Sequence, residues 1–134
     1  MNMNTLVLSQ NGLSREEWML SSWRHASSIA SDSKTLITII VPAKRHASTT
    51  PLRYLVSESG LKKLIKGQSI HVGEVQIRLI SPSSNNSHTH KQVLLVVSAR
   101  EDQIPKIHKI QNVIARVVMP CLAQDEIAWK QLNG

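Results

Sequence analysis

Two segments of the chain, residues 34–42 and 92–98, are nearly uninterrupted runs of aliphatic and β-branched residues. They read KTLITIIVP and QVLLVVS, without the alternation of polar and apolar side chains that a strand exposed on one face shows. A strand tolerates such a composition when both faces of its sheet are covered, as in parallel sheets flanked by helices. The two runs therefore predict central strands of an α/β fold.

Further apolar segments predict the remaining strands. Residues 3–8 and 113–120 are short, apolar and β-branched. Residues 75–79 alternate apolar and polar side chains, which predicts a strand with one buried and one solvated face, preceded by a turn or bulge at Gly73. Residues 75–98 are expected to form a hairpin-like pair, which would make the sheet mixed.

Helices are predicted between these strands. In the sequence SREE, Ser14 is placed as an N-cap and Glu17 completes a capping box, so a helix is expected from there to about residues 31–33. The other helices are expected at about residues 59–66, from Arg100 onward with Ile104, Ile107 and Ile114 on one face, and at residues 123–132.

Two segments have no single predicted helix or strand. One has two possible interpretations, and the other is expected to lack regular structure. Residues 49–67 fit either one long helix capped by Thr50 or a short extended piece at residues 52–56 before the helix, and we expect the second. Residues 81–92 are polar and contain proline, serine and asparagine without periodicity, so they are expected to form a mobile loop.

The order of these elements predicts one domain over residues 1–134. Strands alternate with amphipathic helices, and right-handed crossovers would bring the strands onto one sheet. The expected fold is a three-layer α/β sandwich, Rossmann-like, with a mostly parallel, partly mixed sheet of about five strands and helices on both faces.

The basic charge of the chain is concentrated in its middle. The formal net charge is +7, and residues 33–100 hold ten lysines and arginines against two glutamates. A patch of one sign attracts an anionic partner, here a nucleic acid backbone or an acidic protein. Only Tyr54 lies among these basic residues, and the three tryptophans fall on predicted helices, so contact with phosphates rather than base stacking is expected. The alternative is a basic surface that only keeps the domain soluble.

Polar side chains that follow parallel strands would meet at the carboxyl edge of the sheet. Lys44, Arg45 and His46 follow the second strand and predict an anion site, because guanidinium and backbone N–H groups match phosphate oxygens. A solvated basic turn is the alternative interpretation. The other candidates for anion or partner binding are Ser48, Arg100, Lys62 and Lys63.

Catalysis at the same edge is a second hypothesis, in which the chain is a hydrolase or a transferase. Its weak candidates are Ser9 or Cys121 as nucleophile and His46 as base, with Glu101 as orienter. Ser98 would reach the same edge. No glycine spacing matches a dinucleotide or phosphate-loop fingerprint, and no ligand set has metal spacing, so neither a cofactor nor a metal is expected.

The cellular setting follows from cysteine usage and hydropathy. Cys121 is the only cysteine, no secretory signal is recognisable, and no apolar run approaches the length of a membrane span. We therefore expect a small cytoplasmic α/β binding or regulatory module, within a larger assembly or as a homo- or hetero-oligomer, without a membrane partner.

Overall fold

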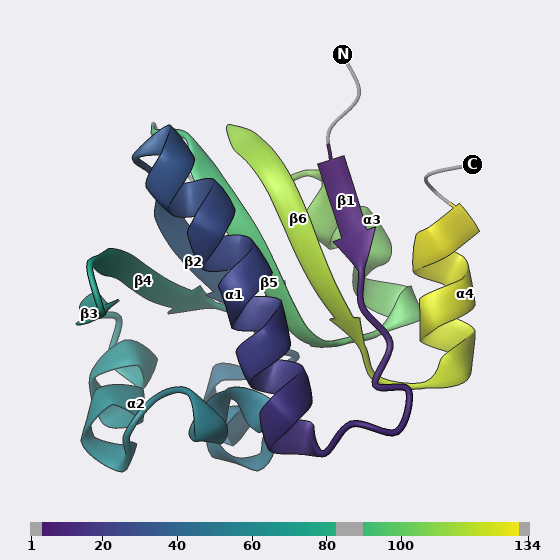
Figure 1. Cartoon of the computed structure of the whole chain (residues 1–134), viewed down its shortest axis with the longest axis horizontal. Helices are drawn as coiled ribbons and strands as arrows, with labels where there is room; N and C mark the ends of the chain where they lie inside the picture. The colour runs from purple at the N-terminus through teal and green to yellow at the C-terminus, as the bar shows by residue number, and fades with distance from the viewer. Residues whose placement is uncertain (1–3, 83–89, 132–134) are drawn as a thin grey trace.

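The computed structural model describes residues 4–82 and 90–131, which fold around a six-stranded sheet (Figure 1). The strands lie in the order β1-β6-β5-β2-β4-β3. The first five in this order are parallel to one another, and β3 is antiparallel to β4. An α/β fold with a mostly parallel sheet is thus confirmed, with six strands in place of about five. The strands are β1 (Asn4–Val7), β2 (Leu36–Ile40), β3 (Ile70–Val72), β4 (Val75–Ile80), β5 (Gln92–Ala99) and β6 (Val113–Pro120).

The pairing of β4 corrects the hairpin expected over residues 75–98. β2 lies between β4 and β5 and is parallel to both, with Ile37 beside Ile77 on one side and Val93 on the other. β4 forms its hairpin with β3, and Gly73 in the turn has a φ of 62°, which fits the predicted turn. Alternation along a strand reports which face is buried and not which strand lies beside it, so the sequence left the partner open.

The helices begin with α1 (Arg15–Ser33), where the predicted capping box is confirmed. The hydroxyl of Ser14 accepts a hydrogen bond from the N–H of Glu17 at 3.1 Å, and the carboxylate of Glu17 accepts one from the N–H of Ser14 at 3.1 Å. The backbone hydrogen bond, and after it the side-chain one, lowers the pKa of the Glu17 carboxyl. The other helical elements are α2 (Glu58–Ile65), α3 (Ile104–His108), α4 (Ala123–Gln131) and the 3-10 helices η1 (Lys44–Thr49), η2 (Pro51–Tyr54) and η3 (Glu101–Gln103).

Within residues 49–67, the helix expected at about residues 59–66 is confirmed as α2, but the extended piece expected before it is wrong. Thr50 donates its hydroxyl to the carbonyl of Ala47 at 2.6 Å and accepts the N–H of Leu52 at 3.2 Å, so one side chain ends η1 and starts η2. Residues 52–56 are therefore not extended. Ser57 then caps α2 separately, through the N–H of Gly60 at 3.1 Å.

The helix expected from Arg100 is also shorter than predicted. α3 ends at His108, and Ile114 belongs to β6. Asn112 turns the chain into this strand with a left-handed backbone, at a φ of 62°. Most of the loop predicted over residues 81–92, namely residues 83–89, lies outside the described residues.

Two apolar clusters lie on opposite faces of the sheet, called here the front face and the rear face (Figure 1). On the front face Met19 of α1 is fully buried with Leu95 of β5. On the rear face Ile107 of α3 and Trp129 of α4 are fully buried with Leu94, the neighbour of Leu95 along the same strand. None of the helices in the described ranges is long and apolar enough to cross a lipid bilayer.

Candidate functional site

The chain leaves the neighbouring strands β2 and β5 toward opposite faces. From β2 it continues through α2, on the front face, to β4, whereas from β5 it continues through α3, on the rear face, to β6 (Figure 1). In open parallel sheets, ligands bind beyond the carboxyl ends of the strands at such a switch point. Residues 41–46, which follow β2, and residues 98–101, at the carboxyl end of β5, therefore form the candidate site at this edge.

Ser98 marks the switch point with an unusual backbone. Its φ of 57° is left-handed, and the register between β5 and β6 shifts between Val97 and Ala99. Left-handed backbone costs a residue with a side chain about 1–2 kcal/mol, and such residues cluster at functional sites. The sequence predicts the place of Ser98 at this edge but not its conformation, which depends on the pairing with β6.

The segment between β2 and β3 gathers the basic side chains of the middle of the chain. We call residues 44–66 the basic excursion; within it η1 contacts both η2 and α2, at the lower end of the view in Figure 1. Lys44 is half-buried, whereas the side chains of Arg45, His46 and Ser48 are exposed. The cations of the excursion are Lys44, Arg45, Arg53, Lys62, Lys63 and Lys66.

The charge of the basic excursion is almost uncompensated. Its one acidic residue, Glu58, lies 4.0 Å from the ammonium group of Lys62, and both side chains are exposed, so this ion pair is weak. Arg100, which follows β5 at the same edge, is different because its Nε lies 3.5 Å from a carboxylate oxygen of Asp102. Lys44, Arg45 and Lys63 form no such ion pair with other described residues.

The aromatic residues are placed for packing. Trp18 and Trp129 are buried, and Trp23 is half-buried. Tyr54 lies within the basic excursion, but the guanidinium of Arg53 covers its ring at 4.8 Å and donates a hydrogen bond to its hydroxyl at 2.8 Å. This arrangement leaves phosphate contact, rather than base stacking, as the chemistry that the excursion can offer.

The four residues of the catalytic hypothesis follow four different strands, with Glu101 after β5. Ser9 follows β1 and Cys121 follows β6, which are neighbours, whereas His46 follows β2, on the far side of β5. Within the described part of the chain, no hydrogen bond joins the side chains of Ser9, His46, Cys121 and Glu101. These residues stay predictions.

Asp125 is a buried carboxylate at this edge that the sequence analysis did not single out. It is only 3% exposed, and its two oxygens accept the backbone N–H groups of Glu101 at 2.7 Å and Leu122 at 2.9 Å. It thereby joins the segment after β5 to the start of α4. An acidic residue in the first turn of a predicted helix was the available signal, but it did not indicate the contact with Glu101.

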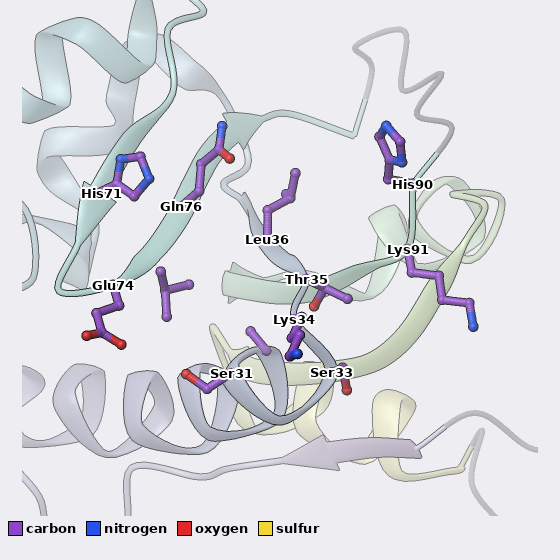
Figure 2. A pocket seen from close by; sticks show the side chains of 12 residues that line it. Ser31, Ser33, Lys34, Thr35, Leu36, His71, Glu74, Gln76, His90 and Lys91 are labelled. Atoms are coloured by element: carbon purple, nitrogen blue, oxygen red, sulfur yellow. The ribbon is translucent and has the colours of Figure 1, made fainter.

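A hollow of about 680 Å³ lies at the opposite edge, where the strands begin. Figure 2 shows its walls: the end of α1, the start of β2, the β3–β4 hairpin and the residues before β5. It was not expected from the sequence, because its residues lie at the amino ends of the strands and ligands of parallel sheets are expected at the carboxyl ends. Its polar lining residues include Ser31, Ser33, Lys34, Thr35, His71, Glu74, Gln76, His90 and Lys91.

The side chains of the hollow carry mixed charge. Lys34 and Lys91 face it from one side and Glu74 from the hairpin, and all three are exposed (Figure 2). The hydroxyl of Thr35, at the start of β2, is buried without a hydrogen-bond partner. Among the residues in the described ranges, no group of three or more histidine, cysteine or acidic side chains could hold a metal ion.

A buried polar network lies on the rear face of β2, β4 and β5. Gln92 is fully buried, and its carbonyl oxygen accepts hydrogen bonds from the hydroxyl of Thr38 and from Arg78 at 3.0 Å. Arg78 also donates to the hydroxyl of Thr38 at 2.8 Å, and the amide nitrogen of Gln92 donates to the carbonyl of Gln111 at 2.9 Å. Burial lowers the pKa of the Arg78 guanidinium.

His108, the last residue of α3, connects α4 with β6 on the same face. Its ring stacks on Trp129, with 6.1 Å between ring centroids. Burial, and after it the positive charge of Arg116 on β6, lowers the pKa of His108 from its ordinary value of 6.5.

The lowered pKa of His108 predicts a loss of stability in acid. The unfolded chain takes up a proton at this histidine near pH 6.5, whereas the folded chain takes it up only at a lower pH, so the free energy of unfolding falls as the pH drops below 6.5. We expect His108→Gln to remove part of the loss measured by urea unfolding between pH 7.5 and pH 5.5. His46→Gln, at an exposed position in η1, is the control. An unchanged loss in His108→Gln would contradict the assignment.

The comparisons with known proteins found no match. No protein-family model, no curated protein and no solved structure matches this chain.

Proposed function

We propose that the chain is a small binding module whose basic excursion contacts the phosphate groups of a nucleic acid backbone. The observation that supports it is the clustering of six cations, opposed by Glu58 alone, on three short elements that pack together at the carboxyl edge of the sheet. These cations could bind the phosphates of the partner without first breaking an ion pair, apart from the weak pair between Lys62 and Glu58.

The proposal also covers three features expected from the sequence. We propose that the protein is cytoplasmic, that it is part of a larger assembly, and that its fold is a three-layer, Rossmann-like arrangement. Support for the three layers comes from the front and rear apolar clusters. The anion-binding roles are assigned to Lys44, Arg45, His46, Ser48, Lys62 and Lys63, with Arg100 at the margin because Asp102 lies beside it.

An enzymatic function is the second candidate, favoured by one observation. Ser98 has its strained backbone at the switch point between β2 and β5, where active sites of such sheets lie. The candidate nucleophiles Ser9 and Cys121 have no hydrogen bond to His46 within the described residues, so the binding module has the stronger support.

The test measures binding to a fluorescent 20-base-pair duplex by anisotropy over a range of salt concentrations. We expect Lys44→Gln/Arg45→Gln/Lys62→Gln/Lys63→Gln to weaken binding at least ~100-fold near 0.1 M salt. It should also reduce the slope of log affinity against log salt by up to about 3.6, since each of the four lost phosphate contacts contributes about 0.9. The salt dependence identifies phosphate contacts specifically, because they release counterions.

The matched control removes four positive charges elsewhere, at the exposed Lys91, Lys106, Lys109 and Lys130. We expect it to retain most of the affinity and the slope. If both variants lost the same affinity, the effect would depend only on the net charge of the protein, and the assignment to the basic excursion would be refuted. Tighter binding to polyglutamate than to the duplex would identify an acidic protein as the partner instead.

A further inference from the structure

Arg116 of β6 is a buried cation whose charge no carboxylate compensates among the described residues. Its side chain lies on the rear face, and the residue is only 5% exposed. The described ion pairs join Lys62 to Glu58, Arg100 to Asp102 and Lys130 to Glu126, and none includes Arg116. Burying a guanidinium is unfavourable unless acceptors replace its water, so Arg116 requires an explanation.

The hydrogen bonds of Arg116 are incomplete as well. Its Nη1 lies 3.5 Å from the hydroxyl of Thr5 on β1, which is a long contact. Its Nε is buried and has no hydrogen-bond partner. Nε stands on the edge of the guanidinium whose two parallel N–H groups bind oxyanions in a fork. Arg78, the other arginine on this face, is different because its Nε and Nη2 donate to Thr38 and Gln92.

A second donor without an acceptor lies on the same face, where Trp129 shares an apolar cluster with Leu94, the register partner of Arg116. Trp129 is fully buried, and its indole N–H has no hydrogen-bond partner. His108 stacks on Trp129 and lies near enough to Arg116 for the guanidinium charge to lower its pKa. Helix α3, which carries His108, lies behind β6 and β1 in Figure 1, and helix α4, which carries Trp129, lies beside β1. The three side chains therefore belong to one region of the rear face, in which Arg116 and Trp129 are buried and His108 is exposed.

We propose that Arg116, Trp129 and His108 form a binding site for a small oxyanion, of which inorganic phosphate is the simplest. Arg116 would bind two oxygens through its fork and supply the charge, and the indole N–H of Trp129 would donate a further hydrogen bond. Because Arg116 is 5% exposed, the site suits a free ion rather than a phosphate attached to a larger molecule. It is separate from the basic excursion and does not depend on the proposed nucleic acid partner.

The experiment is thermal unfolding in chloride buffer with increasing sodium phosphate at constant ionic strength. A ligand that binds only the folded chain raises the melting temperature. We expect a rise of roughly 3–7 °C at a phosphate concentration ten times the dissociation constant for a domain of this size. We expect no rise in Arg116→Met, which retains the length of the side chain without its charge and donors.

The same variant in phosphate-free buffer gives a second result. Arg116→Met should melt no lower than the wild type there, since it removes an unpaired buried charge. A clearly lower melting temperature would mean that the protein itself already satisfies Arg116 and would overturn the proposal. So would a phosphate-dependent rise that persists in Arg116→Met, or a wild type that does not respond to phosphate.

Two further variants test whether the response to phosphate depends on the indole N–H of Trp129 and whether it depends on the surface charges of the basic excursion. Trp129→Phe retains the aromatic ring but lacks the N–H, and we expect it to need a higher phosphate concentration for the same rise. The fourfold basic-excursion variant should respond to phosphate like the wild type. A lost response in that variant would place the anion at the surface and overturn the buried site, whatever its effect on nucleic acid binding.

Discussion

Replacing Gln92 with methionine is expected to lower the free energy of unfolding by about 2–4 kcal/mol. Methionine fills nearly the same volume, so the loss measures polar contacts rather than a cavity. The substitution leaves the buried hydroxyl of Thr38, one N–H group of Arg78 and the carbonyl of Gln111 without their present partner. Buried polar groups that lose a partner cost more than the hydrogen bond itself contributes to stability.

Urea unfolding of Gln92→Met and Gln76→Met provides the measurement and its control. Gln76 lies on β4 and is exposed, so the same change there should alter stability by no more than ~0.5 kcal/mol. The double variant Arg78→Met/Gln92→Met should lose less than the sum of the single losses, because it removes donor and acceptor together. A loss in Gln92→Met no larger than that in Gln76→Met would show that the network does not stabilise the sheet.

Replacing Asp125 with alanine is expected to cost about 2–3 kcal/mol. The N–H groups of Glu101 and Leu122 would lose their acceptor, and α4 would lose its attachment to the segment that follows β5. The loss of stability should be smaller than that expected for leaving two fully buried N–H donors without an acceptor. Glu101 and Leu122 are themselves exposed, so water can replace part of the contact. We expect the far-ultraviolet spectrum to stay close to that of the wild type below the transition.

Asp102→Ala is the matched control for Asp125→Ala. Asp102 carries the same carboxylate a few residues after β5, but its side chain is 70% exposed and forms only a long ion pair with Arg100. Its loss should stay within ~0.5 kcal/mol in the same urea titration. If both substitutions had equally small effects, the hydrogen bonds of Asp125 that connect η3 with α4 would not contribute to stability.

The elements that the sequence predicted well depend on contacts within a few residues. The capping box of Ser14 and Glu17 spans four positions, and the turn at Gly73 spans two. Apolar composition likewise placed the strands, because a buried strand must be apolar on both sides wherever it lies in a sheet. The parallel arrangement followed from the spacing of strands and helices, since a parallel neighbour requires a long crossover.

The features that were mispredicted depend on contacts between distant residues. β2 lies between β4 and β5 through pairings that span about 40 to 60 residues, and no local pattern encodes such a neighbour. The helical form of residues 52–56 depends on the Thr50 hydroxyl, which could equally have capped one long helix. The same limit applies to the site, where Asp125 reaches Glu101 and the hollow combines three separate segments, residues 30–36, 71–76 and 90–91.

By itself, the sequence determined the apolar strands, the N-terminal capping box of α1, and the basic charge of the middle of the chain, because these follow from composition and short-range chemistry. Only the tertiary structure decided the strand order, the network around Gln92 and the isolation of Arg116 on the rear face. An arginine in the strand VIARVVMP reads as an ordinary solvated cation in the sequence. Burial beneath α3 and α4 makes it a charge that needs an acceptor, and burial is a property of the assembled fold.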